Sequence, residues 1–235
     1  MVVMNVHDNR TYSPATFIGG CPMQHEMFKL CADSLRTFSK EKYDIKLKAA
    51  HAHELVAAYF GYSSKNAMLA DSKYPIRNLG QAEIIVMRPD EDIYQRRKNL
   101  QGLSPELPDS YTLGEAVYAS LFSDEWWASE HPPFRNFKML AKFLFENNDA
   151  FQNVFKFYHD IPMHHIVDVN DSENDVILTV LHSYRASTKE MLVGGKSTIK
   201  LPRVAGRIGY GKPIIDVEQW TGGARRTLKS MGVQL

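Results

Sequence analysis

The side chains best suited to metal chemistry in this sequence gather near residue 160. His159, His164 and Asp168 offer two imidazoles and a carboxylate over a short stretch, a donor set that suits zinc, manganese or iron. With an open coordination position, these three ligands would support a metal-dependent hydrolase, which is one alternative for the function. The other interpretation is a local cluster of surface and buried histidines, because His164 and the adjacent His165 point to opposite faces of an extended chain.

Two further motif-like patterns lack the context that their chemistry requires. Gly195-Lys196-Ser197 ends like a phosphate-binding P-loop, but Glu190 stands where the first glycine of that loop belongs, and a strand-like run follows. His51 and His53 have the spacing of a paired metal site on a strand. Their neighbours favour a helix, on which side chains two residues apart diverge by about 200°. We therefore expect no cofactor and favour a protein that is not an enzyme.

The distribution of charge indicates a polyanionic partner. From Arg185 to the end the sequence has ten Lys and Arg and three acids, a net charge of +7, whereas the first 184 residues carry a net charge of −6. We expect these cations to form one exposed basic strip that binds the phosphates of nucleic acid, DNA rather than RNA. A surface that docks onto an acidic protein partner is the alternative. The expected contacts in the strip are Lys200, Arg203, Arg207, Lys212, Arg225 and Arg226.

The stretch from Asp44 to Asp71 predicts a helical hairpin. Asp44 is suited to cap a helix that runs to Phe60, and Gly61 provides the left-handed residue that ends it. Ser63 or Ser64 would start a second, short helix in which Ala67 and Ala70 pack inward. A helix, a glycine-containing turn and a second helix form the outline of a helix-turn-helix. In that interpretation the further contacts to DNA are Lys65 and Asn66.

Two segments carry a family resemblance. HAHELVAAYFGYSSKNAMLAD, at residues 51–71, resembles a short helical module found in proteins of bacterial plasmids and integrative elements, and a related module is described as glyoxalase-related. RPDEDIYQRRKNLQGLSPELPDSYTLGEAVY, at residues 88–118, is similar to the same family. The resemblance implies the context of a mobile genetic element. Together with the basic strip, it leads to the hypothesis of a non-enzymatic, nucleic-acid-binding accessory protein of a bacterial mobile genetic element. The resemblance implies no catalytic residues and no metal ligands.

The order of the expected elements gives an α+β fold. Helices are expected at about 22–40, 46–60, 90–100, 112–122, 134–146 and 149–158, with one early strand at 83–87. Thr112 and Glu115 have the spacing of a capping box for the fourth of these helices. After residue 161 the pattern changes to β-branched strands between glycine-rich turns. We expect a helical N-terminal two-thirds packed against a C-terminal antiparallel β-sheet, in segments 1–80, 81–160 and 161–235.

Composition favours a soluble cytoplasmic protein. The sequence is 44% hydrophobic and 23% charged, which is typical of a folded globular chain. It contains no apolar run of the length that a bilayer requires, so we expect no membrane partner. Its two cysteines, Cys21 and Cys31, lack the spacing of a zinc site and fit a reducing compartment.

Overall fold

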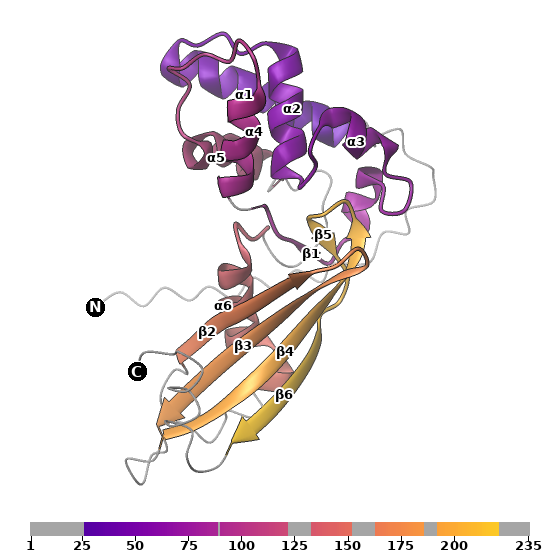
Figure 1. Ribbon diagram of the computed structural model, residues 1–235, viewed down its shortest axis with the longest axis vertical. Coiled ribbons are helices and arrows are strands. Elements are labelled where there is room, and N and C mark those ends of the chain that lie inside the picture. The colour runs from indigo at the N-terminus through magenta and orange to yellow at the C-terminus, as the bar shows by residue number, and fades with distance from the viewer. Residues whose placement is uncertain (1–25, 89, 122–132, 152–162, 186–191, 221–235) are drawn as a thin grey trace, which may run out of the picture.

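Helices make up the first part of the chain and a sheet makes up the last, which confirms the expected α+β fold. The computed structural model describes residues 26–88, 90–121, 133–151, 163–185 and 192–220. In Figure 1 most of the helices gather at one end of the molecule, and the long strands extend away from them.

The helical end is built around α2, which is almost wholly buried from Leu55 to Phe60. Its apolar and alanine-rich sequence explains why neighbours cover it on several sides. Helices α1, α4 and α5 pack on it, and Tyr59 in α2 donates a hydrogen bond from its hydroxyl to the carbonyl of Ser110 in α5. The elements of this end are α1 (Glu26–Tyr43), α2 (Ala49–Tyr59), α3 (Lys65–Ala70), the short helix η1 (Ile76–Gln81), α4 (Asp90–Asn99) and α5 (Ser110–Leu121).

The sheet is antiparallel, and β4 lies at its centre. Strand β4 pairs with β3 on one side, while on the other it pairs with β6 along its first half and with β5 near its end. The early strand β1, expected from its apolar run, pairs with β5 and so ties the helical end to the sheet. The strands are β1 (Ile84–Ile85), β2 (Met163–Asp171), β3 (Asp175–Arg185), β4 (Leu192–Ala205), β5 (Gly209–Tyr210) and β6 (Ile214–Trp220).

Helix α6 (Phe137–Asn147) covers one face of this sheet. Its buried residues Leu140 and Leu144 pack with Leu178 of β3 and Ile199 of β4 in one apolar cluster. A second cluster fills the helical end, and it includes Ala205 and Ile208 from the β4–β5 connection. Each cluster therefore draws on residues that are far apart in sequence, and the division into three sequence segments stays a prediction.

Two helix starts differ from their expectation. Asp44 does not cap α2; it has a φ of +56° and follows the last residue of α1, while Lys48 precedes α2 without a side-chain cap. The cap of α5 is Asp109, whose carboxylate accepts the backbone N–H of Thr112 at 2.8 Å, so Thr112 lies inside the helix that it was expected to begin. The residue at the observed helix start lies within four residues of the expected one: Lys48 follows Asp44, and Asp109 precedes Thr112.

Candidate nucleic-acid interface

The helical hairpin forms as expected at its turn. Gly61 has a φ of +83° and follows the last turn of α2. Ser64 caps α3, because its hydroxyl accepts the backbone N–H of Ala67 at 3.0 Å. The inward packing of α3 differs from the expectation, however: Met68 is its buried residue, and Ala67 and Ala70 are exposed. Helix α3 is therefore a short helix that presents most of its side chains to solvent.

Lys65 and Asn66, the expected DNA contacts on this hairpin, lie at the start of α3. The backbone N–H of Lys65 donates to the Glu54 carboxylate at 3.2 Å, and Glu54 also forms an ion pair with Arg96 of α4. These contacts fix the first turn of α3 against α2 and α4. Asn66 is exposed and Lys65 is half-buried, so both reach the surface.

Arg207 is the C-terminal cation that the fold brings to this hairpin. It lies in the turn between β4 and β5 and is exposed. A Cβ placed on Gly61 would lie 2.6 Å from the Cβ of Arg207, so the two turns pack directly against each other. Arg207 therefore stands beside the turn that precedes Lys65 and Asn66.

The other described cations of the expected strip differ in exposure and in ion pairing. Lys212 is exposed beyond β5. Lys200 forms an ion pair with Asp175 at 3.0 Å across the β3–β4 pair. Arg203 is not an exposed cation: its side chain is 3% exposed and pairs with Asp171 at the end of β2. Arg203 also donates from Nε to the carbonyl of Ser172 at 3.2 Å.

The burial of Arg203 follows from strand alternation. Ser197, Ile199, Leu201, Arg203 and Ala205 occupy alternate positions of β4, and all are buried. Side chains two residues apart in a strand share a face. The apolar residues Ile199 and Leu201 therefore indicate, from sequence alone, that residue 203 lies on the covered face of the sheet. A net charge contains no such information.

The acidic partners lie at the connection between β2 and β3, where Asp171 is the last residue of β2 and Asp175 the first residue of β3. Asp171 pairs with Arg203 and also with Arg88 at 2.8 Å, and Asp175 pairs with Lys200. In the same connection, Glu173 pairs with Lys73 of the helical end at 2.9 Å. This connection neutralises cations on both sides of it, so the described part of the C-terminal third does not present one continuous basic strip.

The remaining candidates stand partly outside the described residues. Arg225, Arg226 and His159 lie in segments that the structure does not describe, and the side chain of His164 is likewise outside the description. Asp168 is exposed on β2. Among the described residues, no three His, Cys, Asp or Glu side chains are placed to hold a metal ion.

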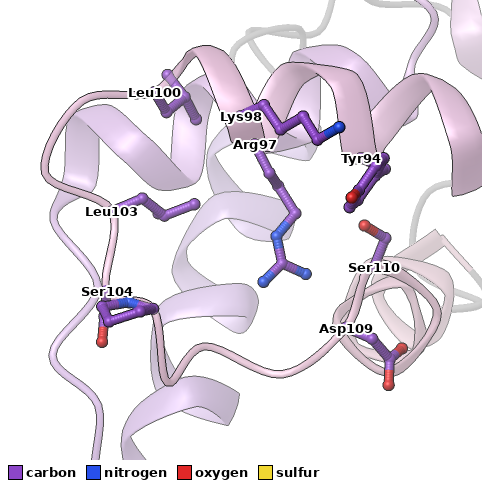
Figure 2. Close-up of a pocket in the computed structure, with 9 residues that line it drawn as sticks. Tyr94, Arg97, Lys98, Leu100, Leu103, Ser104, Asp109 and Ser110 are labelled. Carbon is purple, nitrogen blue, oxygen red and sulfur yellow. The ribbon is translucent and has the colours of Figure 1, made fainter.

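A pocket of about 360 Å³ lies between the end of α4 and the start of α5 (Figure 2). Arg97 points into it and donates to the carbonyls of Leu107 and Pro108 at 2.8 and 2.5 Å. Asp109 at its rim caps α5. Arg97 and Asp109 therefore hold the loop and the helix start that form two sides of the pocket.

Cys31 and His53 pack against other side chains of the helical end. Burial raises the pKa of the Cys31 thiol to about 12, so it is protonated and unreactive at neutral pH. His51 and His53 both lie on α2, which confirms the helical interpretation of that segment. The ring of His53 stacks on Phe28 at a centroid distance of 5.1 Å.

Searches against family models, curated proteins and solved structures find no match to this chain. In the part of the chain that the structure describes, every helix is too short or too polar to traverse a bilayer.

Proposed function

We propose that the protein binds nucleic acid through the turn surface, which we define as Lys65, Asn66 and Arg207. The position of Arg207 beside Gly61 is the observation that supports this proposal. An exposed short helix supplies side chains to base edges, and a cation next to the turn supplies a phosphate contact. Of the contacts expected in the C-terminal third, Arg207 is the one that the described residues bring beside the hairpin turn.

The proposed ligand is double-stranded DNA. The major groove of B-DNA is wide enough to admit a helix, whereas the corresponding groove of A-form RNA is deep and narrow. Asn66 is suited to the edge of adenine. The role that fits the family resemblance of residues 51–71 is a non-enzymatic, cytoplasmic accessory protein of a bacterial mobile element.

The charge of the turn surface sets the expected strength of binding. Each neutralised phosphate contributes about 0.9 to the slope of log affinity against log salt. Lys65 and Arg207 alone give a slope of about −2, and a basic strip of six cations would give about −5. The salt dependence therefore distinguishes the turn surface from the strip.

The experiment is a fluorescence titration of a labelled duplex of about 20 base pairs, two helical turns, at several salt concentrations. The protein is first freed of nucleic acid in high salt. Saturable binding with a slope near −2, and weaker binding to an RNA duplex of the same length, supports the proposal. No binding of the duplex at about 50 mM salt contradicts it.

A protein-interaction module is the second candidate, and a row of residues on the face of the sheet opposite α6 favours it. Ile177, Lys200 and Ile214 lie opposite one another on β3, β4 and β6, and the Ile214 side chain is 60% exposed. Apolar side chains beside a lysine suit an acidic partner with apolar side chains, and the acidic group of that partner would replace Asp175 on Lys200. A protein that co-purifies in fixed stoichiometry, in place of nucleic acid, would support this candidate.

A further inference from the structure

One carboxylate bridges two arginines at the junction between the helical end and the sheet. Arg88, which follows β1, donates from Nη1 to Oδ2 of Asp171 at 2.8 Å. Arg203 of β4 donates from Nη2 to Oδ1 of the same carboxylate. The two oxygens of Asp171 thus each serve a different guanidinium, which is how a phosphate is held between two arginines.

One donor beside this carboxylate is unused. Arg203 is buried, and its Nη1 has no hydrogen-bond partner within the described part of the chain. Arg88 has a second acidic neighbour, Asp92, at 3.0 Å. A tetrahedral phosphate has more acceptor oxygens than a carboxylate, so it could engage the same two arginines together with the free donor of Arg203.

The bridged pair adjoins the turn surface. A Cβ on Gly61 would lie 3.1 Å from the side chain of Arg88 and 2.6 Å from that of Arg207. The aliphatic stems of both arginines therefore flank the α2–α3 turn. Arg88 and Arg203 share the carboxylate of Asp171, and Asp92 also pairs with Arg88. These four groups carry no net charge together, so loss of Asp171 would leave them with a net charge of +1.

We infer that Arg88 and Arg203 form a phosphate site that Asp171 occupies in the free protein, and that a backbone phosphate of the bound nucleic acid displaces it. The inference rests on the proposed function for the identity of the ligand. The side chain of Asp171 is 25% exposed, so it can turn toward solvent while β2 stays paired with β3. Asp171 then acts as an internal competitor that weakens binding of any single phosphate.

The test uses the full chain with Asp171→Ala, and Asp168→Ala as the matched control, because Asp168 is an exposed aspartate of the same strand. Inorganic phosphate is titrated at constant ionic strength, with the dissociation constant measured by calorimetry and the melting temperature measured in parallel. We expect D171A to bind phosphate at least about tenfold more tightly than the wild type, a difference of about 1.4 kcal/mol. Added phosphate should also raise the melting temperature of D171A more than it raises that of the wild type. D168A should match the wild type.

Arg88→Ala in the D171A background should remove the gain, and D171N serves as the second variant if D171A does not fold. Equal phosphate affinity of D171A and the wild type, or a gain that survives R88A, would overturn the inference. The outcomes separate it from the proposed function. Tighter phosphate binding by D171A without duplex binding supports the anion site and contradicts the nucleic-acid function. Duplex binding without tighter phosphate binding by D171A supports the nucleic-acid function and contradicts the anion site.

Discussion

Gly61 and Arg207 pack so closely that no side chain fits between them. A Cβ at Gly61 would stand 2.6 Å from the Cβ of Arg207, and the φ of Gly61 is +83°. The turn of the helical hairpin and the turn between β4 and β5 are thus in direct contact. This contact places a C-terminal cation beside α3 and underlies the turn surface.

The first prediction concerns that contact. Gly61→Ala should destabilise the protein by about 2 kcal/mol or more, because the left-handed backbone is strained for alanine and the new methyl group meets Arg207. Gly102→Ala is the matched control: its φ is +71°, but nothing lies within 4 Å of its Cβ position. G102A should therefore cost about 1 kcal/mol from backbone strain alone. Urea unfolding measures both, and equal costs would contradict the close packing.

The second prediction concerns Gly195, the first residue of the P-loop-like triplet. It lies within β4, where an added Cβ would come 2.2 Å from Nε2 of His182 and 2.4 Å from the carbonyl oxygen of Glu218. Gly195→Ala should cost about 3 kcal/mol through overpacking. Gly211→Ala, whose Cβ would meet Val204 at an ordinary 3.4 Å, should stay within about 0.5 kcal/mol of the wild type. A tolerated G195A in thermal unfolding would show that this strand pairing is wrong.

The third prediction separates the two ion pairs of β4. Arg203→Ala removes the buried guanidinium that pairs with Asp171 and should lower the free energy of unfolding by about 2 kcal/mol or more. Breaking a buried ion pair is costly because the remaining charge loses its partner away from water. Lys200 is half-exposed, and Lys200→Ala should cost less than about 1 kcal/mol. Chemical denaturation of both variants gives the comparison. Similar small costs would mean that Arg203 is a surface residue after all.

The fourth prediction concerns acid stability. The pKa of Asp175 is lowered by the hydroxyl of Ser172, at 2.6 Å, and then by Lys200. A lowered pKa in the folded state means that ionised Asp175 stabilises the fold above its unfolded pKa of about 4, and that this contribution is lost as pH falls through the folded value. Asp175→Asn should therefore lose less stability than the wild type between about pH 5 and pH 3. Parallel pH curves for the two proteins, measured by urea unfolding, would argue against this contribution.

Much of the architecture followed from local sequence patterns. β-Branched residues between glycine-rich turns predicted β3, β4 and β6, because such side chains pack well in a sheet. Apolar spacing predicted α2 and α6, because it reflects burial of one helix face. The helix caps were harder, since Asp109 and Thr112 compete for the same role within four residues and only geometry decides between them.

The candidate site was less accessible to sequence reasoning because it depends on pairings across the chain. The net charge after Arg185 does not reveal which cations are exposed: alternation in β4 buries Arg203, and the last residue of β2, Asp171, supplies its carboxylate. The junction of Gly61 with Arg207 joins residues 146 positions apart. No local pattern encodes such a contact, so the turn surface could only emerge from the fold.

The most direct test of the turn surface compares Arg207→Ala with Lys212→Ala in duplex DNA binding. Both residues are exposed cations close in sequence, and only Arg207 lies against the hairpin turn. At about 150 mM salt, where charges more than about 8 Å away are screened, R207A should weaken binding about tenfold and reduce the salt slope by about one unit. K212A should leave both nearly unchanged. Equal losses in the two variants, or no loss in R207A, would contradict the account.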